Sequence, residues 1–93
     1  MRLYELTVIF PLEEDQYQAG RELLQADLAA AGVEIVKTDE IGDRDLAYEI
    51  DRRRRGRYAL FTLKVEPAKI AGMDKAFKLN AHLLRYLFVR VEE

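Results

Sequence analysis

Residues 58–65 read Tyr-Ala-Leu-Phe-Thr-Leu-Lys-Val, and every second side chain from the alanine onward is apolar. This alternation is typical of a β-strand with one buried face. Residues 2–10 alternate in the same way and are followed by Pro11. Residues 83–91 are rich in branched and aromatic side chains and predict a further strand. The chain is therefore predicted to begin and end with strands, with its best strand between them.

Each of the two intervals between these strands contains a helical pattern. Apolar or small residues recur at spacings of three and four over residues 17–31, and Gly32 follows as a helix-ending residue. A shorter pattern of the same kind covers residues 67–77 and starts at a proline, which is favoured in the first turn of a helix. The sequence therefore predicts one long helix and one short helix.

Residues 33–50 predict a second, largely polar strand, and residues 52–57 predict a charged hairpin connection to the next strand. The resulting order, β-α-β-β-α-β, is that of the ferredoxin-like arrangement. The fold class is predicted as α+β, with a four-stranded antiparallel sheet that carries both helices on one face. With 93 residues, the chain is expected to form a single domain over residues 1–93.

The composition excludes several classes of protein. The chain has no cysteine, which excludes a disulfide scaffold, and one histidine, His82, which excludes a multi-histidine metal site. Apolar residues make up 49% and charged residues 34%, as in a globular protein. The N-terminus carries no apolar run of the length of a signal peptide or a membrane span. We expect a cytoplasmic protein that holds no metal or cofactor.

Catalytic patterns are missing from the sequence. The five glycines never cluster into a phosphate-binding loop, there is no serine, and the acidic run at residues 39–45 has no histidine beside it. An acylphosphatase-type enzyme would need an anion-binding turn after the first strand, whereas residues 11–15 are acidic. The protein is therefore predicted not to be an enzyme.

Charge is polarised along the chain, although the formal net charge is only −2. Residues 2–51 hold 4 basic and 13 acidic side chains, whereas residues 52–91 hold 11 basic and 2 acidic ones. One interpretation is a basic face that binds a polyanion. The other is that strands of the two halves interleave in space and their charges cancel.

Residues 52–57 read Arg-Arg-Arg-Arg-Gly-Arg, which is the strongest chemical signal in the chain. Five guanidiniums this close repel one another, and bidentate contacts with phosphate oxygens would relieve that repulsion. Tyr58, Tyr86 and Phe88 lie in the same basic half, where aromatic rings could stack on bases. The arginine run favours a polyanion ligand, with a solvated turn as the alternative.

Five short segments share a pattern with one known family. They are Arg2–Glu5, Gly42–Ile50, Gly56–Tyr58, Phe77–Asn80 and Leu84–Leu87. Taken together, they resemble the bacterial small-subunit (30S) ribosomal protein S-six (S6) family. The likeness spans the whole chain with the same order of elements, and Leu-Ala-Tyr combined with the stretch from Asn80 to Arg85 is its most specific part.

The resemblance implies a structural protein of the small ribosomal subunit with a ferredoxin-like fold and no enzymatic activity. It implies binding to the central domain, or platform, of 16S ribosomal RNA as a heterodimer with small-subunit ribosomal protein S-eighteen (S18). It implies neither a small-molecule substrate nor a membrane.

The predicted RNA-binding residues combine family positions with the arginine run. Arg2, Asn80 and Arg85 match the family, and the N-terminus is expected to lie close to the start of the last strand. The arginine run and Lys78 extend this set within the basic half of the chain. The complete set is Arg2, Arg52, Arg53, Arg54, Arg55, Arg57, Lys78, Asn80 and Arg85.

Two departures from the family concern the partner protein. Glu49 stands where the family commonly has proline, and Asp43 and Asp45 make a usually basic segment acidic. Because S18-type proteins are basic, this edge is expected to face the partner rather than RNA. Tyr48 and Ile50 are candidate apolar contacts, with packing inside the monomer as the alternative. The predicted partner interface is Asp43, Asp45, Tyr48 and Ile50.

Two other functions remain open on sequence grounds. One is an autonomous module that binds single-stranded RNA in the manner of an RNA-recognition motif, because residues 55–61 are a distorted match to that signature. The other is a ligand-sensing, oligomeric ferredoxin-like domain. The first would bind RNA without a partner protein, whereas the second would self-associate and ignore RNA.

Overall fold

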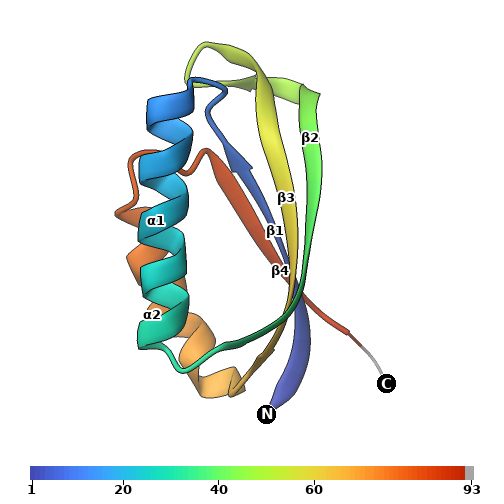
Figure 1. Cartoon of the computed structure of the whole chain (residues 1–93), viewed down its shortest axis with the longest axis vertical. Helices are drawn as coiled ribbons and strands as arrows, with labels where there is room; N and C mark the ends of the chain where they lie inside the picture. Colours follow the sequence, from blue (N-terminus) through green and yellow to red (C-terminus); the bar gives the residue numbers. More distant parts are fainter. Residues whose placement is uncertain (92–93) are drawn as a thin grey trace.

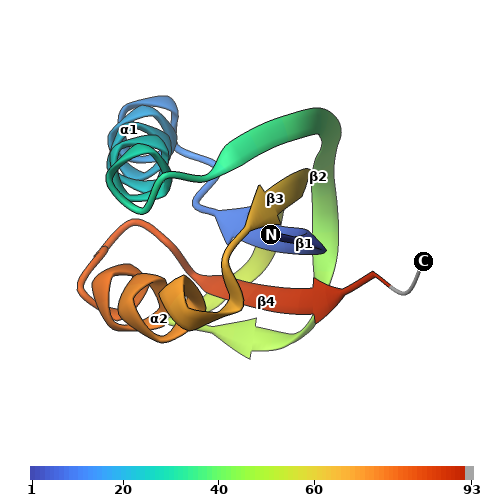
Figure 2. The same cartoon turned by 90° about the horizontal axis from the view of Figure 1, so that it is seen from below.

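The computed structural model describes residues 1–91. Its elements are, in order, β1 (Arg2–Phe10), α1 (Glu14–Ala30), β2 (Glu34–Ile50), β3 (Arg53–Val65), a 3₁₀ turn (Pro67–Lys69), α2 (Ile70–Lys78) and β4 (Arg85–Arg90). The strands form one sheet in the order β2-β3-β1-β4, and each neighbouring pair is antiparallel. Both helices cover the same face of this sheet (Figure 1, Figure 2). The predicted ferredoxin-like α+β fold is confirmed.

The helix-covered face of the sheet follows from the alternation in β1 and β3. Leu6 and Val8 of β1 are fully buried, as are Phe61 and Leu63 of β3, and Leu6 lies opposite Phe61 in the ladder. Burying a side chain of this size stabilises a fold by about 1.5–3 kcal/mol. The helices complete the core with four buried side chains, which are Leu24, Leu28, Met73 and Phe77.

The loop between α2 and β4 packs directly against α1 at Gly20. A Cβ on Gly20 would lie 2.4 Å from the carbonyl oxygen of His82, so this contact requires glycine. Asn80 fixes the loop in place: its Nδ2 donates to the carbonyl of Gly20 at 3.0 Å, and the backbone N–H of His82 donates to its Oδ1 at 3.0 Å. Asn80 is only 6% exposed. The side chain of Asn80 is thus used inside the protein, and the predicted contact of Asn80 with RNA stays a prediction.

The hairpin between β2 and β3 is shorter than predicted. Its turn consists of Asp51 and Arg52, whose φ angles of 48° and 65° are those of a two-residue hairpin turn. β3 already begins at Arg53, and Arg55 lies opposite Asp45 in the ladder. The expected connection over residues 52–57 was wrong because acidic residues of β2 accompany the arginines and let them join the sheet.

The end of β2 bends over the outer face of the sheet, opposite the helices. Its pairing with β3 is interrupted between Asp45 and Ile50. Within this interval Leu46 packs over Gly56, where an added Cβ would lie 3.4 Å from the Leu46 side chain. β2 and β4 occupy opposite edges of the sheet, yet this bend brings the end of β2 close to the start of β4 (Figure 2).

Candidate functional site

Arg53 is directed at the first turn of α1. Its Nη1 donates to both carboxylate oxygens of Glu13, at 2.7 and 2.5 Å, and its Nη2 donates to Oε1 of Gln16 at 3.0 Å. The Arg53 side chain is 27% exposed. Strand β3 and helix α1 are thus joined by a charge-assisted contact between residues 40 positions apart in the sequence.

The Arg57 side chain donates hydrogen bonds to more residues than the Arg53 side chain does. Its Nη1 donates to Glu14 at 3.1 Å, its Nε to Asp43 at 3.3 Å and its Nη2 to the carbonyl of Leu12 at 3.3 Å. Its guanidinium also lies 4.2 Å from the centre of the Tyr17 ring, within the range of a cation–π contact. The hydrogen bond with Glu14 is the main cause of a raised pKa at Arg57. Every nitrogen of this guanidinium therefore has a partner inside the protein.

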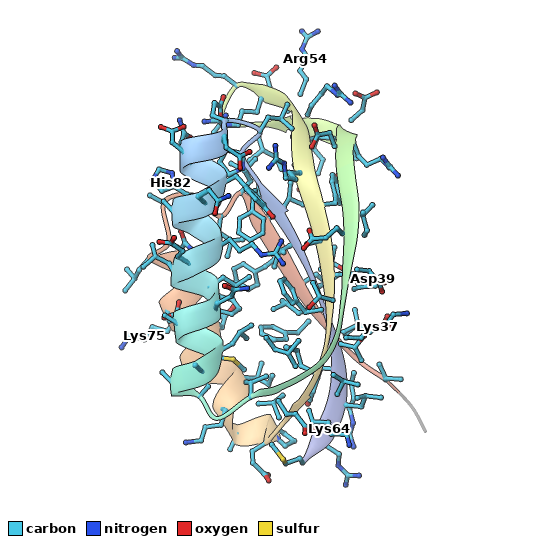
Figure 3. The ribbon with its side chains drawn as sticks, viewed as in Figure 1. Lys37, Asp39, Arg54, Lys64, Lys75 and His82 are labelled. Atoms are coloured by element: carbon cyan, nitrogen blue, oxygen red, sulfur yellow. The ribbon has the colours of Figure 1, made fainter. Side chains whose placement is uncertain are left out.

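The other arginines of the run lie at the surface. Arg55 pairs with Asp45 across the hairpin at 3.2 Å. Arg54 is 89% exposed and lies 3.9 Å from Glu49, at the limit of an ion pair. Arg52 is exposed in the turn and forms no ion pair with any residue among 1–91. Figure 3 shows Arg54 projecting away from the end of the hairpin.

These contacts decide between the two interpretations of the charge pattern. The basic partners Arg53, Arg57 and Arg55 come from the second half of the chain, and their acidic partners come from the first half. Lys64 likewise approaches Glu34 at 3.9 Å. The two halves therefore interleave, and much of the charge polarisation is cancelled within the fold.

The acidic side of this cluster predicts a dependence of stability on pH. A backbone hydrogen bond and then the Arg53 guanidinium lower the pKa of Glu13 below its ordinary value of 4.5, and Gln18 and then Arg57 lower the pKa of Glu14. Depressed pKa values stabilise the folded state above about pH 4.5, and this stabilisation is lost as pH falls through the folded-state pKa values. We expect the urea midpoint to decrease below about pH 4.5, and to decrease less in Glu13→Gln/Glu14→Gln. Parallel pH profiles for the two proteins would contradict this assignment.

The remaining predicted RNA-binding residues do not form one surface. Arg2 lies opposite Val65, whereas Arg85 lies opposite Ile9 at the far end of β1. The expected proximity of the N-terminus and the start of the last strand was wrong, because β1 and β4 are antiparallel. Lys78 is paired with Asp74 at 3.1 Å. Arg85 lies near the hairpin end, and Arg2 at the opposite end of the sheet.

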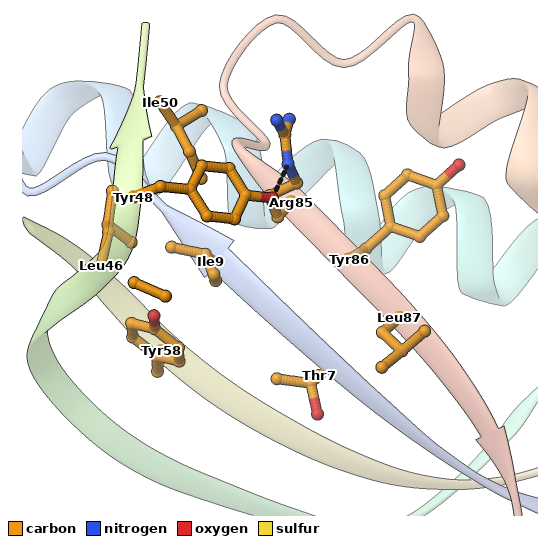
Figure 4. Close-up of a pocket in the computed structure, with 10 residues that line it drawn as sticks. Thr7, Ile9, Leu46, Tyr48, Ile50, Tyr58, Arg85, Tyr86 and Leu87 are labelled. Atoms are coloured by element: carbon orange, nitrogen blue, oxygen red, sulfur yellow. Dashed lines mark hydrogen bonds between the residues drawn. The ribbon is translucent and has the colours of Figure 1, made fainter. Parts of the chain in front are cut away.

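The bend in β2 creates a hollow of about 300 Å³ on the outer face of the sheet, called the outer-face hollow below. Its walls come from all four strands and include Thr7, Ile9, Leu46, Ile50, Tyr58 and Leu87. Tyr48 and Arg85 also line it, and Arg85 Nε donates to the hydroxyl of Tyr48 at 3.4 Å (Figure 4). The hollow is mainly apolar, with a single charged side chain at its rim.

Only two of the four predicted partner residues line the outer-face hollow. Tyr48 is 62% exposed there, whereas Ile50 is 6% exposed and forms part of the wall. Asp43 and Asp45 are instead engaged with Arg57 and Arg55. Sequence reasoning missed Ile9 and Leu87, and it considered Tyr58 for base stacking rather than as a wall of this hollow. Their outward positions in alternating strands could have indicated a face, but not the bend of β2 that encloses it.

Within residues 1–91, no group of His, Cys, Asp or Glu side chains could hold a metal ion. In the same part of the chain, no helix is both long and apolar enough to span a membrane.

Comparison with known proteins gives consistent results. A family model described as "Ribosomal protein S6" matches residues 3–90. A small ribosomal subunit protein bS6 from Treponema denticola is 50% identical over 93 residues, which are 100% of both chains. The corresponding protein of Treponema pallidum strain Nichols is 40% identical over 92 residues, or 99% of each chain. The crystal structure of 30S ribosomal protein S6 from Thermotoga maritima superposes with a TM-score of 0.85 at 19% identity, covering 97% of this chain and 87% of that one.

Proposed function

The chain belongs to the ribosomal protein S6 family, and on this premise we propose that it binds the central domain, or platform, of 16S ribosomal RNA as a heterodimer with ribosomal protein S18. The observation that carries the proposal is the full-length match to bS6 proteins at up to 50% identity. The chain is a structural, non-enzymatic protein of the small ribosomal subunit and is located with the ribosome in the cytoplasm.

The outer-face hollow supports the protein–protein part of the proposal. Leu87 and Val89 of β4 are 61% and 46% exposed on this face, and Tyr48 is 62% exposed. Apolar side chains beside a concave, apolar surface are typical of an interface core, where a buried anchor contributes most of the binding energy. We therefore propose that S18 docks here. Asp43 and Asp45 are assigned a smaller part than the sequence indicated, because their charges are already partnered.

The basic end of the β2–β3 hairpin supports the RNA part. Arg52 and Arg54 are exposed there, and Arg85 lies at the start of β4 nearby. Guanidiniums that keep free donors can form bidentate contacts with phosphate oxygens. Arg2 and Lys78 remain predicted RNA contacts at other places on the surface.

A gel-shift experiment tests the proposed function directly. A central-domain 16S RNA fragment is mixed with this protein, with S18 and with both together. We expect a strong shift only with both proteins, because each supplies part of the RNA-binding surface. A matched RNA from another domain of 16S serves as the control and is expected to remain unshifted.

The other outcomes select the alternative functions. A tight shift with this protein alone would favour an autonomous module that binds single-stranded RNA. No shift in any mixture, combined with self-association of the protein, would favour the ligand-sensing oligomeric domain. Either result would overturn the heterodimer proposal.

A further inference from the structure

We infer that the arginine run is divided between two tasks: Arg52 and Arg54 bind RNA phosphates, whereas Arg53 and Arg57 tie the hairpin to α1 and do not contact RNA. This inference rests on the proposed function for its ligand and adds which guanidiniums the RNA reaches. It revises the expectation that all five arginines of the run bind RNA.

The guanidinium nitrogens of Arg53 and Arg57 are largely occupied by partners inside the protein. Arg53 gives two of its terminal nitrogens to Glu13 and Gln16, and Arg57 uses all three of its nitrogens. Their side chains are only 27% and 24% exposed. The carboxylates of Glu13, which immediately precedes α1, and of Glu14, in its first turn, thus occupy these arginines in the way that two phosphates would.

RNA phosphates could bind Arg53 and Arg57 only by displacing the carboxylates of Glu13 and Glu14. If RNA phosphates replaced the carboxylates, Glu13 and Glu14 would remain as unpaired charges next to the RNA backbone. The negative carboxylates would repel the neighbouring phosphates. The hydrogen bonds from β3 to α1 would be lost at the same time. Exchange is therefore unfavourable, and the internal pairs are expected to persist in the complex.

At Arg52 and Arg54, no strongly bound carboxylate in the described part of the chain competes with RNA phosphates. Arg52 forms no ion pair within residues 1–91, and the contact of Arg54 with Glu49 at 3.9 Å joins two exposed side chains. An exposed pair of this kind is worth about 0–1 kcal/mol, so RNA can displace it at little cost. Arg52 lies in the hairpin turn itself, and Arg54 projects away from the end of the hairpin (Figure 3).

The test uses a generic RNA duplex of about 20 base pairs and the protein without S18 at low salt, because phosphate contacts do not depend on sequence and become strong enough to measure when the salt concentration is lowered, even where no gel shift is expected at physiological salt. Arg52→Gln/Arg54→Gln and Arg53→Gln/Arg57→Gln each remove two positive charges and are matched in net charge. We expect the first variant to lower the slope of log affinity against log salt by roughly 1.8, which corresponds to two lost duplex contacts. We expect the second variant to keep the wild-type slope and to unfold at a lower urea concentration.

Arginine Nε–Hε resonances of the wild-type protein provide a second measurement that does not depend on the folding of a variant. On saturation with the duplex, the resonances of Arg52 and Arg54 are expected to shift, and those of Arg53 and Arg57 to keep their free positions. Equal slope losses in the two variants, comparable shifts for all four arginines, or no binding of the duplex would each overturn the inference. Failure of the proposed function would appear separately, in the mixtures with S18 and 16S RNA.

Discussion

Replacing Leu87 by aspartate is expected to weaken the affinity for S18 by about 30-fold or more, since truncating or charging a central interface anchor typically costs about 2 kcal/mol or more. Leu87 is 61% exposed in the free protein and lines the outer-face hollow. A carboxylate at this place would have to lose its hydration against an apolar partner surface. The dissociation constant is measured by calorimetry with purified S18.

The control for this prediction is the same substitution at another exposed leucine. Leu23 lies on α1 and is 50% exposed, on the opposite side of the sheet from the hollow. Leu23→Asp is expected to leave the affinity for S18 unchanged, and both variants are expected to keep the wild-type urea midpoint within a few tenths of a molar unit, because neither leucine is buried. Equal affinities of Leu87→Asp and the wild type would exclude the outer-face hollow as the docking surface.

Replacing Gly20 by alanine is expected to destabilise the fold by about 1–3 kcal/mol, the usual cost of forcing an extra methyl group into a packed site. The new Cβ would lie 2.4 Å from the carbonyl oxygen of His82 and 2.9 Å from its Cβ. Relief requires the loop to move away from α1, which would stretch the hydrogen bond from Asn80 to Gly20. This loss outweighs the gain in helix propensity. Urea unfolding followed by circular dichroism measures the difference.

Gly72 offers a matched control on the second helix. A Cβ at Gly72 would meet no atom within 4 Å apart from its chain neighbours and the backbone of its own helix. Gly72→Ala is therefore expected to stabilise the protein by about 0.5–1 kcal/mol through helix propensity alone. If both alanine variants are stabilised, the close approach of the loop to α1 is wrong.

The order and type of the elements could be predicted from the sequence because they depend on local patterns. Buried side chains are specified by the alternation in residues 2–10 and 58–65 and by the helical spacing in residues 17–31. The element order β-α-β-β-α-β then leaves few possible topologies. The same reasoning failed at the hairpin. A run of arginines does not indicate a turn when acidic side chains on the neighbouring strand pair with it. A local sequence pattern does not show which strand will be that neighbour.

The candidate surfaces were only partly predictable. The arginine run, Tyr48 and Ile50 were identified, but the division of the run and the other walls of the outer-face hollow were not. Asn80 carries the family pattern, and the sequence could not distinguish a residue that binds RNA from one that holds the α2–β4 loop on α1.

The sequence by itself determined the fold, the family and the absence of catalytic patterns, because hydrophobic periodicity and short motifs are properties of neighbouring residues. The tertiary structure alone decided which charges are free. Glu13 and Arg53 lie 40 positions apart and meet only because α1 packs beside β3. The outer-face hollow likewise exists only because β2 bends across to β4. Electrostatic and surface properties depend on such distant pairs, and these arise only when the chain has folded.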